Sequence, residues 1–123
     1  MVWKLARHLV ATVAISSVAL PAMAASAMSP DEITATFGNG KPFASASPAG
    51  ARYTLILSAD GTASRAPKGS KAATAGKWRV SDVGYCSTWG KSTENCYTIQ
   101  KGDKAYTVRD STGKTVARWT LAN

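Results

Sequence analysis

The sequence contains a single histidine, two cysteines and only seven acidic residues among its 123 positions. The histidine, His8, lies in residues 1–24, a segment with the features of a cleavable export signal. The remaining chain therefore has no residues for a Ser-His-Asp or Cys-His catalytic site, and none for a histidine-rich zinc site. Two cysteines are also too few to form a structural metal site. We expect a protein that is not an enzyme and that needs no cofactor or metal.

Acidic residues are outnumbered by basic ones, because 15 Lys and Arg give the chain a formal charge of +8. These cations are dispersed over the predicted strands and turns, without a basic helix or an aromatic RNA-reading motif. We therefore expect no nucleic-acid partner. A solvated outer face accounts for the cations, and such a face attracts anionic envelope polymers or lipid headgroups.

No hydrophobic run is long enough to cross a membrane. The longest, residues 9–20, has 12 positions, whereas a transmembrane helix needs about 20. Lys4 and Arg7 precede this run, and the small-residue sequence Ala22-Met23-Ala24 follows it. This order is typical of a secretory signal peptide, which predicts a periplasmic or secreted protein with no transmembrane span after cleavage.

Cleavage is expected after Ala24, or after Ala27 as the second choice. Export places Cys86 and Cys96 in an oxidising compartment, where two thiols normally form a disulfide. Direct pairing of the two cysteines in a hairpin puts both sulfurs on one face and the neighbouring aromatic side chains on the other. We therefore predict a Cys86–Cys96 disulfide across two adjacent strands, with Tyr85 opposite Tyr97 and Ser87 opposite Asn95.

Residues 25–50 predict a short helix followed by a linker. Ser29 and Glu32 have the spacing of a capping box at a helix start. Ile33 and Phe37 are one helical turn apart and would share the buried face. The remainder, rich in Gly, Ala and Ser, has little periodicity, so we expect a surface segment up to residue 50.

Residues 51–123 change to a period of two and form the predicted barrel domain. Turn signals such as Asp60-Gly61 separate about seven short strands. The predicted fold is mainly β, an antiparallel meander that forms a small barrel or a curled sheet, with one short N-terminal helix. The predicted strands are residues 52–58, 62–66, 76–80, 85–89, 95–100, 105–109 and 115–121.

Aromatic residues are concentrated in the phase of the strands that faces the interior. They are Trp78, Trp89, Tyr97, Tyr106 and Trp119. These side chains either fill the interior or line a ligand cavity, and the small volume of such a barrel favours filling. We expect all but Trp89 to be largely buried, since their strand parity matches that of the aliphatic residues.

Three motifs follow one another along the chain: Gly76-Lys77-Trp78-Arg79-Val80, then Cys86-Ser87-Thr88-Trp89, then Cys96-Tyr97. Their order resembles that in a family of small exported proteobacterial proteins of unknown function. The resemblance covers roughly residues 28–121. It implies a lipocalin-like antiparallel barrel, and the family brings no catalytic residues to this sequence.

These observations favour an exported, non-enzymatic binding or interaction protein whose partner is an envelope component or another protein. The alternative is an inhibitor of a hydrolase such as lysozyme or a protease, which would insert loop 68–71 or loop 90–93 into the enzyme's cleft. A small apolar ligand in the barrel is a third interpretation.

Overall fold

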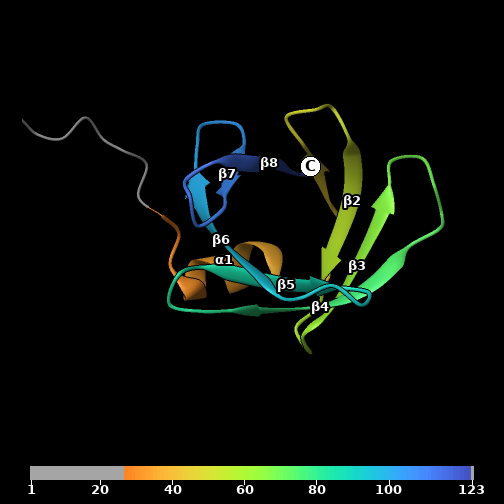
Figure 1. Cartoon of the computed structure of the whole chain (residues 1–123), viewed down its shortest axis with the longest axis horizontal. Helices are drawn as coiled ribbons and strands as arrows, with labels where there is room; N and C mark the ends of the chain where they lie inside the picture. Colours follow the sequence, from red (N-terminus) through yellow and green to blue (C-terminus); the bar gives the residue numbers. More distant parts are fainter. Residues whose placement is uncertain (1–26, 123) are drawn as a thin grey trace, which may run out of the picture.

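The computed structural model describes residues 27–122, which form a closed β-barrel of eight strands with one helix (Figure 1). The strands follow one another around the barrel in chain order, and the antiparallel pairing of β1 with β8 closes it. The predicted mainly β meander is therefore confirmed as a closed barrel. The strands are β1 (Phe43–Ala46), β2 (Arg52–Leu57), β3 (Thr62–Pro67), β4 (Thr74–Val80), β5 (Tyr85–Trp89), β6 (Asn95–Lys101), β7 (Tyr106–Arg109) and β8 (Thr115–Leu121).

The helix α1 (Pro30–Phe37) begins at the predicted capping box. The Ser29 hydroxyl accepts a hydrogen bond from the Glu32 N–H, and the Glu32 carboxylate accepts one from the Ser29 N–H, both at 3.2 Å. Ile33 and Phe37 are fully buried, as their spacing predicts. No helix among residues 27–122 is long and apolar enough to cross a membrane.

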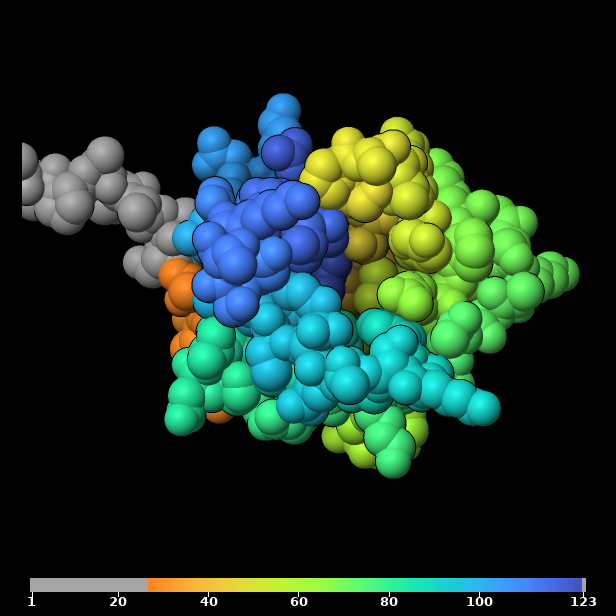
Figure 2. Space-filling model, in the orientation of Figure 1, coloured from red at the N-terminus to blue at the C-terminus, as the bar shows by residue number. Residues whose placement is uncertain are grey.

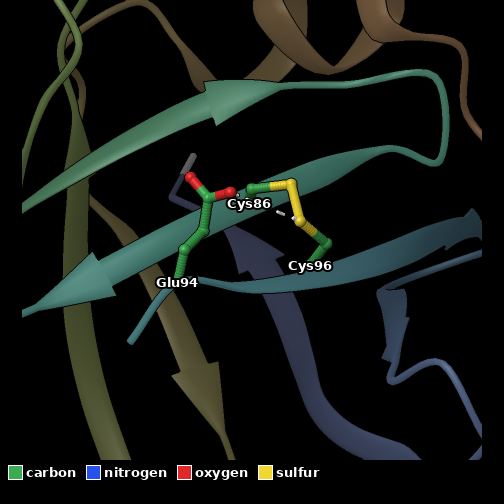
Figure 3. Close-up of side chains that lie close together, drawn as sticks. All are labelled: Cys86, Glu94 and Cys96. Atoms are coloured by element: carbon green, nitrogen blue, oxygen red, sulfur yellow. Dashed lines mark hydrogen bonds between the residues drawn. A yellow bond between two sulfur atoms is a disulfide. The ribbon is translucent and has the colours of Figure 1, made fainter. Parts of the chain in front are cut away.

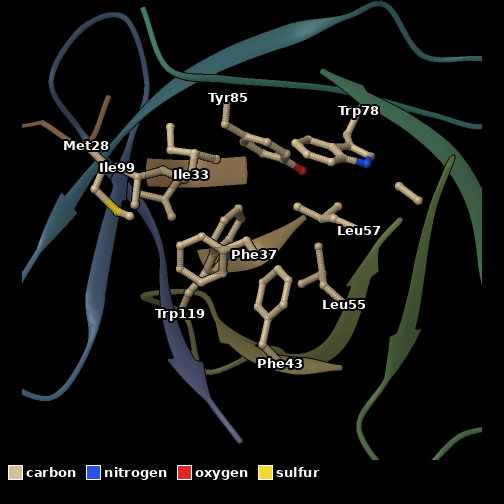
Figure 4. Packing of buried hydrophobic residues seen from close by; sticks show 12 residues of the cluster. Met28, Ile33, Phe37, Phe43, Leu55, Leu57, Trp78, Tyr85, Ile99 and Trp119 are labelled. Carbon is tan, nitrogen blue, oxygen red and sulfur yellow. The ribbon is translucent and has the colours of Figure 1, made fainter. Parts of the chain in front are cut away.

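α1 closes one end of the barrel, and Phe37 is its main point of attachment. The Phe37 ring lies 4.9 Å, centroid to centroid, from each of three rings that belong to three strands, those of Phe43, Tyr106 and Trp119. Figure 4 shows Phe37 at the centre of the buried cluster. The helix is therefore part of the core and not an appendage of the barrel.

The segment predicted as a surface linker contains β1, so the barrel has one strand more than the sequence indicated. The sequence of β1, Phe-Ala-Ser-Ala, includes only one residue type that favours strands. Its conformation comes from pairing on both sides, with β2 and with β8. Phe43 and Ser45 point inward and are buried.

Because successive strands run in opposite directions, the turns that connect them alternate between the two ends of the barrel. α1 lies at one end, the helix end, together with the turns 58–61, 81–84 and 102–105. The opposite end, which we call the mouth, is surrounded by the turns 47–51, 68–73, 90–94 and 110–114.

The disulfide between Cys86 and Cys96 is present at the predicted position, with 4.0 Å between the two Cα atoms. The register of β5 and β6 also agrees with the prediction, since Tyr85 faces Tyr97 and Ser87 faces Asn95. Cys86 is fully buried, whereas Cys96 is partly exposed. The bridge therefore fixes the pairing of two neighbouring strands.

Replacing both cysteines by alanine is expected to lower the free energy of unfolding by about 2.8 kcal/mol, because the unfolded chain gains the entropy of an open loop. Urea unfolding of the two proteins measures this difference. A reductant should destabilise the natural chain by a similar amount and leave the double variant unchanged. Equal unfolding midpoints for the natural chain with and without reductant would contradict a stabilising bridge.

Candidate functional site

A cavity of about 200 Å³ opens at the mouth of the barrel. Its floor is made of side chains that also belong to the core, namely Leu55, Tyr85, Val108 and Trp119. Its walls carry polar and aromatic groups from five strands, namely Ser45, Tyr53, Arg65, Ser87, Trp89 and Tyr97. Figure 2 shows the molecule hollowed between the yellow β1–β2 region, the blue segment toward the C-terminus and the cyan β5–β6 region. The interior is thus filled at the helix end and hollow at the mouth.

Arg65 places a positive charge inside the barrel. Its register partner in β2 is the buried Leu55, so both side chains project from the inner face of the sheet. The guanidinium carbon lies 4.5 Å from the centroid of the Trp89 ring and 5.5 Å from that of Tyr53. Both distances are within the range of cation–π attraction.

No carboxylate neutralises Arg65 within residues 27–122. The one ion pair of this region joins Arg79 to Glu94, on the outer face. The residues that line the cavity include no acidic side chain. The site therefore combines a cation, several ring faces and hydroxyl groups, without a group of negative charge.

Side chains with hydroxyl groups line the same cavity as Arg65. Burial raises the pKa of Tyr85 to about 12, and it also raises the pKa of the less buried Tyr97. Both phenols are therefore protonated at neutral pH and able to donate hydrogen bonds. Ser87 and Ser45 add two more hydroxyls, and each is less than one-tenth exposed.

The raised pKa of Tyr85 predicts a loss of stability in alkaline solution. Because the folded protein holds this proton more tightly than the unfolded chain, the stabilisation is complete below about pH 10 and disappears as the pH approaches 12. A difference of two between the folded and unfolded pKa values corresponds to about 3 kcal/mol. Unfolding of the natural chain and of Tyr85→Phe at several pH values isolates this effect from lysine titration. Identical pH profiles for the two proteins would contradict it.

Gly76 explains how Trp89 reaches its position beside Arg65. A Cβ atom at residue 76 would lie 2.6 Å from Cε3 of the Trp89 ring and equally close to the Thr88 carbonyl oxygen. Gly76 and Trp89 are register partners in β4 and β5, so the ring lies over the glycine. Position 76 must therefore be a glycine, because any side chain there would clash with the Trp89 ring.

The aromatic residues singled out in the sequence divide between the two halves of the interior. Trp89, Tyr97 and Trp119 line the cavity. Trp78 and Tyr106 lie outside it, toward the helix end, where Tyr106 packs against Phe37. Trp78 and Trp119 are buried as predicted, whereas Tyr97 and Tyr106 are only partly buried.

Sequence reasoning missed Arg65, the only charged side chain among the described residues that line the cavity. The hairpin turn at Asp60-Gly61 indicates that Arg65 points inward. Pairing across that turn places Leu57 opposite Ala63 and therefore Leu55 opposite Arg65. Since Leu55 is an inward residue, the hairpin register puts Arg65 inside.

Charge is distributed unevenly between the two ends. Five of the seven acidic residues lie at the helix end, namely Asp31, Glu32, Asp60, Asp82 and Asp103. The turns of the mouth carry four lysines, Lys68, Lys71, Lys91 and Lys114, and two acidic residues, Glu94 and Asp110. Asp110 is engaged by hydrogen bonds within its own turn, and Glu94 pairs with Arg79. The mouth is therefore the more positive end.

A second group of side chains resembles a metal-ligand set but is explained by the disulfide. Cys86, Glu94 and Cys96 lie together on the outer face, as Figure 3 shows. Both sulfurs are bonded to each other, and the Glu94 carboxylate contacts the Arg79 guanidinium at 2.6 Å. This ion pair lowers the pKa of Glu94. With the bridge intact, the cluster has no thiolate to offer a metal.

A larger hollow of about 340 Å³ lies on the outside of the barrel, over Ala44 and Ala46 of β1. Arg52, Lys68 and Arg118 stand around it. The small alanine side chains create this depression. Ser45 and Tyr53 border it as well, but Arg65, Trp89 and Trp119 line only the mouth cavity. We therefore treat the smaller mouth cavity as the candidate site.

Comparisons with protein-family models, curated proteins and solved structures give no match. The family that the motif order resembles is therefore not supported by a matching model. The structure supports the antiparallel barrel which that resemblance implies. The candidate site rests on its geometry.

Proposed function

We propose that the chain is an exported, non-enzymatic binding protein with a lipocalin-like barrel, which takes a small ligand into the mouth cavity. The observation that carries this proposal is the cavity itself, closed by the core below and open between four turns above. A cavity of about 150 Å³ accommodates benzene. A volume of about 200 Å³ therefore suits one ring or a short chain with a small polar substituent.

The chemistry of the cavity favours binding over catalysis. General acid–base catalysis at neutral pH relies on groups whose pKa values lie near 7, most often histidine or a carboxylate. The titratable groups of the cavity are Arg65 and three tyrosines, and burial moves the pKa of Tyr85 further from neutrality. These groups hold and orient a ligand but are poorly suited to exchange protons with it.

The proposal includes export of the protein from the cytoplasm and removal of its signal peptide. The predicted signal, residues 1–24, lies outside the described residues, and the disulfide is consistent with an oxidising compartment. We favour cleavage after Ala24, because Ala27 forms a β-bridge with Gln100 and the buried Met28 donates its N–H to the Ile99 carbonyl at 2.7 Å. Mass spectrometry of exported material should then give a chain that begins at Ala25. A chain that begins at Met1 would contradict export with cleavage.

Ligand binding is tested by titrating the exported protein with small aromatic and aliphatic compounds while its tryptophan fluorescence is recorded. Two of the fluorophores, Trp89 and Trp119, line the cavity. Ala117→Phe fills the cavity from β8, whereas Ala44→Phe adds the same ring to the outer face of β1. We expect the natural chain and Ala44→Phe to bind, and Ala117→Phe to lose binding. Equal binding by both variants would contradict the mouth as the site.

One observation favours a second function, that of a hydrolase inhibitor. The loops 68–71 and 90–93 are exposed, lie at the same end of the barrel and carry Lys68, Lys71 and Lys91. The green and cyan projections in Figure 2 belong to these regions. Assays against lysozymes and proteases test this function, and it requires inhibition at stoichiometric concentrations of the protein.

A further inference from the structure

We infer that the mouth cavity is selective for small aromatic carboxylates, with Arg65 as the group that binds the carboxylate. This inference rests on the proposed binding function and names the class of ligand. It follows from the free donors of Arg65, from the groups around it and from the charge of the mouth.

The donors of Arg65 are available to a ligand. A guanidinium has five N–H donors in a planar fork. Within residues 27–122 the Arg65 side chain donates no hydrogen bond to another residue, and its only side-chain contacts of electrostatic character are with the faces of Trp89 and Tyr53. Cation–π contacts consume no donor. The nitrogen atoms are also not buried, since Arg109 Nε is the one buried side-chain nitrogen of the described chain without a partner.

A carboxylate is the anion that best matches this arrangement. Its two oxygens accept parallel hydrogen bonds from one guanidinium, which adds directional specificity to the charge attraction. Tyr85, Tyr97 and Ser87, which carry hydroxyl groups, line the same cavity. Because the two phenols remain protonated at neutral pH, they offer further donors to an oxygen of the ligand and do not repel it.

The body of the ligand is constrained by the remaining walls. Leu55, Val108 and Trp119 form an apolar floor, and the walls carry the aromatic side chains of Tyr53, Trp89 and Tyr97. Flat apolar groups bind such surfaces through ring–ring contacts and the burial of apolar area. The volume of about 200 Å³ limits the ligand to about one ring within the barrel.

The charged residues around the mouth also favour a negatively charged ligand. Among residues 27–122 no acidic side chain lines the cavity, and four lysines lie on the turns that surround the entrance. A cleft that is lined by charge of one sign raises the local concentration of ligands of the opposite sign. Cationic ligands of equal size would meet Arg65 without a compensating carboxylate, and are therefore excluded.

The inference is tested with three probes of nearly equal shape: benzoate, benzamide and benzylamine. We expect the natural chain to bind benzoate about ten to a hundred times more tightly than benzamide, since hydrogen bonds to a charged group are stronger than neutral ones. Benzylamine, which is a cation at neutral pH, should not bind. The affinity for benzoate should fall with added salt, and that for benzamide should not.

Arg65→Met removes the charge and keeps an unbranched apolar side chain, and Arg118→Met makes the same change on the outer face of β8. We expect Arg65→Met to lose the preference for benzoate over benzamide, and Arg118→Met to keep it. If Arg65→Met does not fold, Arg65→Lys keeps the charge without the fork and should reduce the preference.

The outcomes separate the inference from the function on which it rests. Equal affinity of the natural chain for benzoate and benzamide would overturn the carboxylate selectivity and leave the binding function intact. A preference for benzoate that survives in Arg65→Met would overturn the role of Arg65. Failure of all three probes to bind would overturn the inference, whereas the proposed function would still be judged by the wider set of compounds and the Ala117→Phe variant.

Discussion

Replacing Trp78 by alanine is expected to lower the free energy of unfolding by about 3–5 kcal/mol, the usual cost of removing a large aromatic side chain from a core. Trp78 is 8% exposed and lies at the helix end. Its ring is so close to α1 that a Cβ atom at Gly38 would be 2.6 Å from Cη2 of the indole. The indole N–H also donates a hydrogen bond of 2.7 Å to the Ser58 carbonyl. The variant loses both the packing and this bond.

Urea unfolding followed by far-ultraviolet circular dichroism measures the effect. Trp78→Phe is the matched variant, because it keeps an aromatic ring at this position and removes the hydrogen bond to Ser58. It should be less destabilised than Trp78→Ala. A loss below about 1 kcal/mol for Trp78→Ala would mean that the ring does not pack in the core, since surface substitutions give changes of that size or less.

Replacing Phe37 by alanine is expected to have an effect of the same size, about 3–5 kcal/mol. Phe37 has no exposed surface, and its ring contacts those of Phe43, Tyr106 and Trp119 at 4.9 Å. A domain of this size has a total stability of about 5–15 kcal/mol. The variant is therefore expected to be close to unfolding, with α1 the first element to separate from the barrel.

Amide hydrogen exchange shows whether α1 is the element that Phe37→Ala loosens. The Gly38 N–H, bonded to the Thr34 carbonyl at 2.9 Å, reports on the last turn of α1. Its exchange should accelerate more in Phe37→Ala than that of amides in β5. Thr34→Ala, on the exposed face of the helix, should change the stability by less than about 0.5 kcal/mol. Unchanged exchange at Gly38 in Phe37→Ala would show that the ring does not hold the helix.

The parts of the fold that depend on local signals were predictable from the sequence. The capping box at Ser29 and Glu32 sets the start of α1, because both hydrogen bonds join residues three positions apart. The register of the β5–β6 hairpin followed from the two cysteines, since a disulfide requires them to lie opposite each other.

β1 could not be predicted because its conformation comes from distant residues. Its pairing with β8 joins positions near 43 to positions near 121, and nothing in Phe-Ala-Ser-Ala indicates that contact. The number of strands and the closure of the barrel depend on this one pairing. Closure is a property of the whole chain and has no local signature.

The cavity was left undecided by the sequence for a related reason. Whether aromatic residues fill a barrel depends on what else enters it, and here Ile33 and Phe37 of α1 fill the helix end. The aromatic rings at the mouth therefore line an open cavity. Arg65, the charged residue of this cavity, lies in β3, whose sequence does not alternate clearly between apolar and polar residues. The interior is therefore filled at the helix end and hollow at the mouth.

The most direct test of the account is a nuclear magnetic resonance titration of the exported protein with benzoate. Three tryptophans remain after removal of residues 1–24, and each gives one indole N–H signal. Trp89 and Trp119 line the mouth cavity, whereas Trp78 lies at the helix end with its N–H bonded to Ser58. We expect the signals of Trp89 and Trp119 to move with added benzoate while that of Trp78 stays in place. Movement of the Trp78 signal alone, or no movement of the other two at millimolar benzoate, would contradict carboxylate binding in the mouth of the barrel.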